Sequence, residues 1–459
     1  MNQLVDRYFE SLRGKKLLVL GIGVSNRPLI RMLLGRGFSV TACDKTPRER
    51  LEPEVLELER EGACLHVGEG YLDGLSADVV FRTPGMHPNI PELVRLREQG
   101  AEITSEMEAF FEVCPCTIIG VTGSDGKTTT TTLISRILEH AGRRVFVGGN
   151  IGSPLLPLAG SMGPDDLAVV ELSSFQLMTM TRSPQIAVVT NLAPNHLDMH
   201  RDMAEYVAAK ENIYLHQDAG GKLVLNMDNA ITASFAGKAK GSVELFSRLG
   251  VPENGVYLKD GTIYRNGKPI MAQADILIPG LHNVENYMAA ACAVEGLASD
   301  ADIDAVARTF GGVEHRIELV RTLNGVKWYN DSIASSPSRT IAGLHSFTQK
   351  LILIAGGYDK HIPFEVLGPE ICAHCKTLIL CGATADKIRR AVTSAPEYRP
   401  GFPEIAEADT LAGAVELARK AAAPGDVVTL SPACAAFDQF KNFMVRGETY
   451  KKLVMELEK

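Results

Sequence analysis

The stretch Gly120-Val-Thr-Gly123-Ser-Asp-Gly126-Lys127-Thr128-Thr129 decides the fold of this chain, because a strand pattern enters it and a helix pattern leaves it. The apolar run 116–121 is typical of a buried strand, and residues 128–140 have a helical pattern. Such a turn directs backbone N–H groups and the positive end of a helix toward one point, which suits a phosphate. The glycine spacing departs from the usual Gly-x4-Gly-Lys-Ser/Thr pattern, but the Gly-Lys-Thr lies where a phosphate-binding loop needs it. We therefore predict such a loop here.

Outward from this loop, the chain divides into three regions that each open with an apolar strand running into glycine. At about 150 residues per domain, a chain of 459 residues corresponds to about three domains. We expect an α/β fold: a Rossmann-like domain at 1–114, a central P-loop ATPase-type domain at 115–314 and a second Rossmann-like domain at 315–459. Turn signals at Asp260-Gly261 and Asn266-Gly267 predict a small antiparallel β insertion within residues 242–271.

Charge and hydropathy exclude several classes of protein. The sequence has 47 Lys and Arg residues against 55 Asp and Glu, a formal net charge of −8, which argues against nucleic-acid binding. No apolar run approaches the ~18 residues of a membrane helix, and the first residues lack the apolar core of a signal peptide. We expect a cytoplasmic protein that does not contact a membrane.

The nine cysteines are sparse for this length and indicate free thiols in a reducing compartment. The spacing Cys372-Ala-His-Cys375 also occurs in metal and redox sites, but no second pair accompanies it. We interpret these cysteines as ordinary thiols on or near a helix, with a metal or redox role as the alternative.

The first region carries part of a dinucleotide-binding fingerprint. Gly21-Ile-Gly23-Val-Ser25-Asn26 follows a strand pattern, and Asp44 comes about 20 residues later. Asn26 stands where the fingerprint requires its third glycine. A hydride-transfer enzyme is therefore a weak interpretation of this turn.

Two positions of the central region suit metal binding. Glu171 ends the strand pattern 167–171, and hard cations prefer oxygen ligands of this kind. His196 lies in the loop after another strand, where a histidine can bind a metal or transfer a proton. His200 lies four residues further on, and we expect no site role for it.

Three more polar residues lie on predicted helices of the central region. Lys210 belongs to the stretch Tyr206-Val-Ala-Ala-Lys210, where a lysine is ordinarily solvated. Asn283 and Asn286 are one helical turn apart, so both side-chain amides can face one ligand.

A strand followed by Gly-x-x-Gly-Lys-Thr-Thr-Thr is similar to the loop of the Mur ligases and of their relative folylpolyglutamate synthase. These are ATP-dependent, amide-forming enzymes of three α/β domains. The resemblance implies ATP and two Mg²⁺ ions as cofactors, with Lys210 carbamylated by CO₂ into a carboxylate-like ligand. The implied catalytic residues are Lys127, Glu171, His196 and Lys210, and the implied metal ligands are Thr128, Glu171, His196 and Lys210. The implied ATP-binding residues are Gly123, Ser124, Asp125, Gly126, Lys127, Thr128, Thr129, Asn283, Asn286, Arg316 and Asp331.

The segment 430–447 resembles one branch of the Mur ligases, which adds D-glutamate to UDP-N-acetylmuramoyl-L-alanine. The chain lacks the Asp-Asn-Pro-Arg-like motif of the branch that takes a diamino acid. The resemblance implies that the UDP substrate is bound by Val24, Ser25, Asp44, Lys45, Gly85 and Asn150. It implies that D-glutamate is bound by Lys360, Ser335 and Phe443.

Two positions depart from that branch. Ile333 stands where a lysine is usual, and Ala436 stands where a serine that contacts D-glutamate is usual. We expect one contact to the phosphate or acid, and one to the amino acid, to be lost or rerouted.

The resemblance implies a monomeric, ADP-forming ligase that activates a carboxylate as an acyl phosphate and passes through a tetrahedral intermediate. Its small-molecule substrates would be UDP-N-acetylmuramoyl-L-alanine and D-glutamate, in peptidoglycan precursor synthesis. A sister Mur ligase or a folylpolyglutamate-type ligase is the enzymatic alternative. A non-catalytic ATP-binding switch is the alternative from another class.

Overall fold

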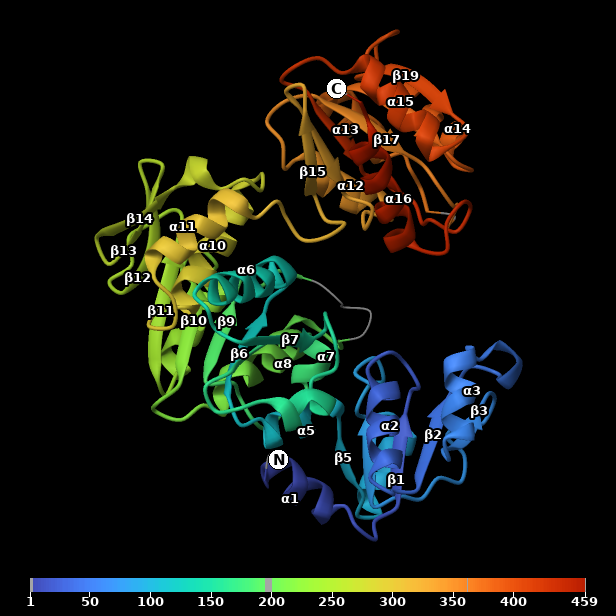
Figure 1. Ribbon diagram of the computed structural model, residues 1–459, viewed down its shortest axis with the longest axis vertical. Coiled ribbons are helices and arrows are strands. Elements are labelled where there is room, and N and C mark those ends of the chain that lie inside the picture. The colour runs from blue at the N-terminus through green and yellow to red at the C-terminus, as the bar shows by residue number, and fades with distance from the viewer. Residues whose placement is uncertain (1–2, 195–199, 361, 459) are drawn as a thin grey trace. The chain divides into compact units, whose positions relative to one another are not determined.

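The computed structural model describes residues 3–194, 200–360 and 362–458, whose strands form three sheets (Figure 1). The chain divides into two compact units, Met1–Ala272 with Glu285–Val306 and Gln273–Val284 with Ala307–Lys459. Strands that alternate with helices in parallel and mixed sheets confirm the α/β fold class predicted from the sequence. Among the described residues, no helix combines the length and the apolar character needed to span a bilayer.

The first unit contains a five-stranded parallel sheet in its N-terminal part. Its strands are β1 (Leu17–Leu20), β2 (Val40–Asp44), β3 (Cys64–Val67), β4 (Val79–Arg82) and β5 (Glu102–Thr104). The accompanying helices are α1 (Gln3–Ser11), α2 (Asn26–Gly35), η1 (Arg48–Arg50), α3 (Pro53–Arg60), α4 (Pro91–Glu98) and α5 (Glu106–Val113). The strand order is β3-β2-β1-β4-β5. Strands β2 and β3 are added on one side of β1, and β4 and β5 are added on its other side, so the strand order switches between β1 and β4. Ligands of open α/β sheets bind beyond the carboxyl ends of the strands at such a point.

The first unit also contains a nine-stranded sheet. Its strands are β6 (Thr117–Thr122), β7 (Val145–Gly149), β8 (Leu167–Glu171), β9 (Ile186–Val189), β10 (Lys222–Asn226), β11 (Ser242–Ser247), β12 (Gly255–Lys259), β13 (Thr262–Arg265) and β14 (Lys268–Ala272). The short helix η4 (Gln273–Asp275) belongs to the second unit. The helices associated with the nine-stranded sheet are α6 (Lys127–His140), η2 (Leu156–Ser161), α7 (Ser174–Leu177), α8 (Met203–Leu215), α9 (Ala230–Ser234), η3 (Phe235–Lys238), α10 (Leu281–Ala293) and α11 (Asp300–Thr309). The last two helices each contain residues of both units.

The strand order of this sheet is β14-β13-β12-β11-β10-β9-β6-β8-β7. The pairs from β7 to β12 are parallel, and only β12–β13 and β13–β14 are antiparallel. The antiparallel strands therefore continue one edge of the large sheet and begin at residue 255. The strand at 242–247, which falls inside the predicted insertion, pairs in parallel with both of its neighbours.

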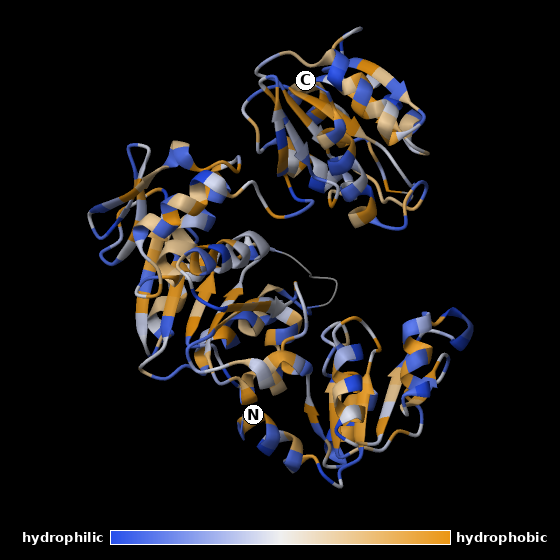
Figure 2. Cartoon of the chain, viewed as in Figure 1, coloured by the Kyte–Doolittle hydropathy of each residue, from blue (hydrophilic) through white to orange (hydrophobic). Residues whose placement is uncertain are grey.

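The second unit contains a six-stranded sheet in the order β15-β16-β20-β17-β18-β19. Its strands are β15 (Glu318–Leu323), β16 (Val326–Asn330), β17 (Leu351–Ala355), β18 (Cys375–Cys381), β19 (Glu404–Ala408) and β20 (Val427–Leu430). Its helices are α12 (Pro337–Leu344), α13 (Leu367–His374), α14 (Ala385–Thr393), α15 (Leu411–Ala421) and α16 (Phe443–Glu456). Two apolar cores form, one with α12, α13 and α14 and the other with α15 and α16. Because both faces are covered, the two central strands β17 and β20 are almost wholly apolar, as Figure 2 shows.

Candidate active site

The predicted phosphate-binding loop lies between β6 and α6, and its glycines are required by geometry. Gly126 has φ of 77°, and an added Cβ would lie 2.4 Å from Asn286 Oδ1. A Cβ on Gly123, whose φ is 151°, would lie 1.9 Å from Thr190 Oγ1. Only glycine fits at these two positions, because any side chain would clash and the positive φ values would be strained.

The first residues of the loop are held by the chain that follows β9. The N–H of Ser124 donates to the Asn191 carbonyl at 2.9 Å, and the N–H of Asp125 donates to Asn191 Oδ1 at 2.9 Å. The Ser124 hydroxyl is buried and bonded to the Ala193 carbonyl and to the Tyr206 hydroxyl. Ser124 and Asp125 thus shape the loop, which leaves the N–H groups at the start of α6 to face a ligand.

Lys127, Thr128 and Thr129 form the first turn of α6, at the positive end of the helix. Lys127 Nζ donates to the carbonyls of Gly123 and Ser124, both at 2.9 Å. The ammonium group is therefore held against the loop, where a phosphate bound at the helix N-terminus would meet it.

Glu171 ends β8 and is 1% exposed. Its Oε1 accepts a hydrogen bond from Asn150 Nδ2 at 2.8 Å, while Oε2 is buried and has no hydrogen-bond partner among the described residues. A buried carboxylate oxygen without a donor is costly unless a cation completes it, so Glu171 fits a Mg²⁺ ligand. Asn150 orients that carboxylate through a contact that the sequence alone does not indicate.

Lys210 is not a solvated lysine, because α8 buries it to 1% exposure. Its Nζ donates to Thr122 Oγ1 and to the Gly123 carbonyl, both at 3.0 Å. Burial lowers the pKa of Lys210 well below its usual value, and the nearby Lys127 ammonium lowers it further, while Glu171 acts in the opposite direction. A neutral amine beside the loop is therefore favoured.

The predicted residue His196 lies outside the described residues. His200 is buried, its Nε2 lies 2.8 Å from Ser174 Oγ, and its ring stacks on Phe175 with 5.4 Å between centroids. These contacts give His200 a packing role.

Asn286 reaches the loop from α10. Its Oδ1 accepts a hydrogen bond from Thr130 Oγ1 at 3.2 Å, and the residue is 4% exposed. Asn283 lies on the preceding turn of α10 and donates to the Pro279 carbonyl at 2.6 Å. The two asparagines lie on consecutive turns of α10, and the shared ligand for their amides stays a prediction.

A cleft in the first unit adjoins three of the predicted UDP-binding segments. It is lined by residues of the β1–α2 turn, of the 82–84 segment and of the loop after β7, among them Val24, Ser25 and Gly152. Asp44 lies at the end of β2 and accepts the N–H groups of Ile22 and Thr46, so its carboxylate is engaged in shaping that turn.

Partial burial would raise the pKa of Asp44, but hydrogen bonds from Ile22 and Thr46 together with the Lys45 charge hold this pKa below its ordinary value. Asp44 therefore stays ionised at neutral pH. Lys45 and Gly85 are exposed on turns after β2 and β4.

Two charged residues that line this cleft, Arg82 and Glu106, were not predicted from the sequence. Arg82, the last residue of β4, is 1% exposed and donates to the carbonyls of Thr83, Pro84 and Met86. It thereby holds the turn that carries Gly85. Glu106 is 5% exposed and accepts the N–H of Leu156 at 2.7 Å. Arg82 could have been suspected, because it is a charged residue directly before the turn Thr83-Pro84-Gly85. Nothing in the sequence around Glu106 indicated its place in the cleft.

Glu106 makes the stability of the fold depend on pH. Burial raises the pKa of its carboxyl to about 7, from about 4.3 in an unfolded chain. The folded state therefore holds the proton more tightly, and the stability from Glu106 is lost as the pH rises from about 4.3 through about 7. As the pH rises over this range, we expect the melting temperature of Glu106→Gln to increase relative to that of the wild type. Thermal melts at several pH values test this, with the exposed Glu112→Gln as control.

Asp331, a predicted ATP-binding residue, directly follows β16 in the second unit. Asp331 is 4% exposed and accepts the Ser431 hydroxyl at 2.7 Å; burial raises its pKa to about 7. The N–H of Arg316 donates to the Val313 carbonyl, and the Arg316 side chain lies close enough to lower the Asp331 pKa somewhat.

The predicted amino-acid ligands are also in the second unit. Phe443 begins α16 and packs edge-on against His315, while Lys360 is exposed and Ser335 is half-buried. Arg339 donates to the Ile333 carbonyl at 3.3 Å, so a cation stands beside the position that lacks the usual lysine. Ala436 is buried and offers no side-chain hydroxyl.

The comparisons with known proteins identify the class. The Mur ligase middle domain matches residues 121–294, and the glutamate ligase domain of Mur ligases matches residues 315–434. The chain belongs to the Mur ligase family, whose members use ATP and Mg²⁺.

The similar relatives include particular enzymes of that family. Proteins named UDP-N-acetylmuramoylalanine--D-glutamate ligase from Acetivibrio thermocellus and from Clostridium botulinum are 52% and 49% identical to this chain, over 100% of both sequences in each case. A third protein of that name, from Clostridium novyi, is 50% identical over the same full coverage.

Solved structures share the fold at low identity. UDP-N-acetylmuramate-alanine ligase MurC from Thermotoga maritima has a TM-score of 0.57 and 18% identity, covering 96% of this chain and 99% of its own. A UDP-N-acetylmuramoyl-L-alanyl-D-glutamate--2,6-diaminopimelate ligase has a TM-score of 0.57 and 15% identity, covering 92% of this chain and 94% of its own. These likenesses support the fold alone.

Proposed function

We propose that this protein is an ATP-dependent ligase that joins D-glutamate to UDP-N-acetylmuramoyl-L-alanine, releasing ADP and phosphate, in peptidoglycan precursor synthesis. The full-length identity of about 50% to three proteins named for this reaction carries the proposal. We place the reaction in the cytoplasm, where nucleotide-linked substrates and ATP occur together, and we propose that the enzyme acts as a monomer. We assign the UDP substrate to residues 1–114, ATP to 115–314 and the incoming amino acid to 315–459.

A free carboxylate is a poor electrophile, because its leaving group would be oxide. Transfer of the γ-phosphoryl group of ATP to the alanyl carboxylate creates an acyl phosphate, which has a good leaving group. The amine of D-glutamate then attacks the carbonyl carbon, and phosphate leaves from the tetrahedral intermediate. Three anionic reactants must therefore meet, and repulsion between two unit charges 4 Å apart is about 4 kcal/mol at an effective dielectric constant of 20.

Local positive charge in the central region offsets this repulsion. Lys127 would contact the β- and γ-phosphates at the N-terminus of α6, where its Nζ is already held over the loop. Thr128 and Glu171 would hold one Mg²⁺, and His196 with carbamylated Lys210 a second. Bound there, Mg²⁺ neutralises phosphate charge and orients the reacting oxygens.

The remaining assigned residues would position the substrates. We assign the loop 123–129 and Arg316 to the phosphates of ATP, Asn283 and Asn286 to the adenine, and Asp331 to the ribose. Lys360, Ser335 and Phe443 are assigned to D-glutamate. The UDP substrate is assigned to Val24, Ser25, Asp44, Lys45, Gly85 and Asn150.

The cleft supports only part of the assignment of the UDP substrate. Val24 and Ser25 line it, whereas the Asn150 amide is bonded to Glu171. For Asn150 we therefore propose an indirect role through that carboxylate.

We expect Lys210 to carry the carbamate. The lowered pKa of Lys210 favours the neutral amine, whose lone pair can form an N–C bond to CO₂ while a proton passes to solvent. Protein prepared in ¹³C-bicarbonate should show a carbamate carbon resonance that is missing from Lys210→Arg and retained in the exposed control Lys240→Arg. A wild-type spectrum without this resonance would exclude the carbamate.

Phosphate release with UDP-N-acetylmuramoyl-L-alanine and ATP tests the proposed function. We expect turnover with D-glutamate and little above background with L-glutamate, L-lysine or meso-diaminopimelate. Preference for L-lysine or meso-diaminopimelate would assign the chain to a sister Mur ligase. ATP binding without phosphate release for any amino acid would favour a non-catalytic switch.

A further inference from the structure

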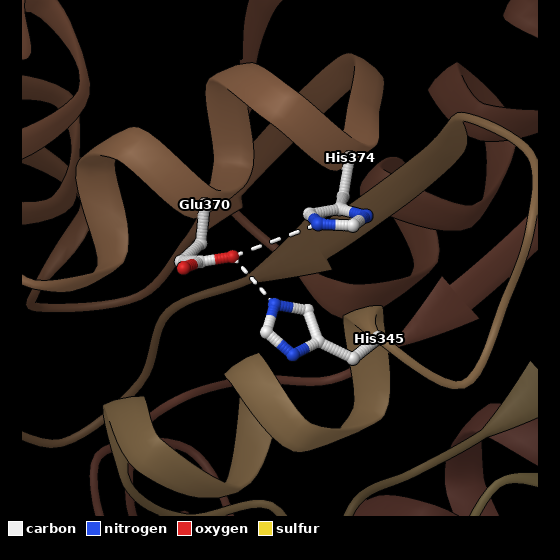
Figure 3. A group of neighbouring side chains, drawn as sticks. All are labelled: His345, Glu370 and His374. Carbon is white, nitrogen blue, oxygen red and sulfur yellow. Dashed lines mark hydrogen bonds and ion pairs between the residues drawn. The ribbon is translucent and has the colours of Figure 1, made fainter.

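Three metal-ligating side chains meet in the second unit, and none of them belongs to the proposed ligase chemistry. His345, Glu370 and His374 each offer one ligand atom, and these atoms lie within 4.8 Å of one another. His345 Nε2 lies 2.6 Å and His374 Nε2 lies 3.6 Å from the same oxygen, Glu370 Oε2. Figure 3 shows the three side chains pointing toward a common centre.

The local fold explains this convergence. Glu370 and His374 are four residues apart on α13, so they share one face of the helix. His345 follows the last residue of α12, and α12 and α13 pack side by side in one core of the sheet. The two imidazole rings have centroids 4.8 Å apart. The site therefore joins the end of one helix to the face of the next.

The distances suit a tetrahedral ion after a small movement. Bonds of about 2.0–2.1 Å in a tetrahedral zinc site separate two ligand atoms by about 3.3–3.4 Å. The distance from His374 Nε2 to Glu370 Oε2 is close to this value, whereas the shorter His345 contact must open by about 0.7 Å. The three side chains are 51%, 32% and 31% exposed, so they can move without repacking the core.

A second cluster of possible metal ligands is less suitable than the first, because its ligand atoms already bond other side chains. Among the described residues, Glu314, His315 and Glu448 also gather their ligand atoms. There, however, Lys451 Nζ already bonds both carboxylates, at 2.7 and 3.2 Å. In addition, His315 Nδ1 lies 2.9 Å from Asn330 Nδ2.

Lys350 is a cation whose charge acts on His374, but it does not occupy the cluster. Its Nζ donates to the Cys372 carbonyl at 3.3 Å. Cys372 and Cys375 are buried free thiols, and Cys372 Sγ lies near the Val392 carbonyl. The cysteines flanking His374 in the sequence therefore do not complete the site.

We propose that His345, Glu370 and His374 bind a divalent transition-metal ion such as Zn²⁺. Two imidazoles and one carboxylate are a donor set of zinc sites that keep a coordination position open, here for water. Imidazole ligands favour Zn²⁺, Ni²⁺ and Cu²⁺ over Mg²⁺, which prefers oxygen ligands. The ion would cross-link α12 to α13 and stabilise the second unit.

Zn²⁺ titration of the full-length, chelator-treated protein by calorimetry tests this site, with excess Mg²⁺ present to fill oxygen-rich sites. We expect one Zn²⁺ per chain and affinities about 100-fold weaker or worse in His345→Ala, Glu370→Gln and His374→Ala, because even outer-shell losses cost about 10–100-fold. Glu365→Gln and His216→Ala, exposed controls, should bind like the wild type. Equal binding by His374→Ala and the wild type, or no Zn²⁺ binding, would overturn the proposal.

Thermal melts provide a second readout that does not depend on ligase turnover. At a Zn²⁺ concentration that saturates the wild type but lies below the dissociation constant of Glu370→Gln, Zn²⁺ should raise the melting temperature of the wild type and leave that of the variant nearly unchanged, because only a bound ion shifts the folding equilibrium. Equal metal-free melts show that the variant folds. An equal Zn²⁺-induced rise in both proteins would place the ion elsewhere.

Discussion

Replacing Lys127 with alanine is expected to lower kcat by on the order of 10²-fold or more, the cost of losing one well-placed charge-stabilising donor. The side chain lies at the first position of α6, and its Nζ is fixed by two carbonyls of the loop. The phosphates of ATP would receive this charge together with the N–H groups of the helix. Phosphate release at saturating substrates measures the effect.

The exposed Lys259 on β12 is the matched control, because Lys259→Ala removes the same charge from a strand at a distant point of the sequence. Its kcat should equal that of the wild type. Near-normal turnover in Lys127→Ala, with an unchanged melting temperature, would refute the phosphate role.

Replacing Glu171 with glutamine is expected to lower kcat by a similar factor, on the order of 10²-fold or more, and to raise the Mg²⁺ concentration needed for half-maximal rate. Glutamine keeps the shape of the side chain and an oxygen that can accept the Asn150 hydrogen bond. It removes the negative charge from a buried site whose Oε2 has no donor among the described residues. Rates measured across a Mg²⁺ series separate metal affinity from turnover.

Glu139, exposed on α6, serves as control: Glu139→Gln should leave both the rate and the Mg²⁺ dependence unchanged. If Glu171→Gln shows the wild-type Mg²⁺ dependence, then Glu171 does not hold the ion. A lower rate at unchanged Mg²⁺ dependence would reduce its role to supporting the loop.

Two of the strands that the sequence predicted, β6 and β8, are buried, although the buried strand β10 was not predicted. The patterns 116–121 and 167–171 correspond to β6 and β8, because strands covered on both faces are continuous apolar runs. Strands β3 and β5 were missed: they are short and only partly buried, so few apolar residues marked them. Strand β19 was missed for the same reason.

The burial of two candidate site residues, Lys210 and Ser124, could not be predicted from their residue types. Lysine on a helix is ordinarily exposed, yet α8 packs against β6 and buries Lys210 beside the loop. Ser124, a candidate phosphate ligand, instead holds the loop through Tyr206 and Ala193. Neither placement has a signal within a few residues of the sequence.

The sequence by itself determined the glycine-rich turn between β6 and α6 and the succession of α/β units, because glycine spacing and apolar runs act through neighbouring residues. Only the tertiary structure decided what surrounds that turn. Asn191 and Asn286 reach it through contacts of partners 66 and 156 positions apart in the chain. Asn191 comes close because β9 lies beside β6 and the carboxyl ends of parallel strands meet at one edge of the sheet. Asn286 comes close because α10 packs its side chain against Gly126 and Thr130.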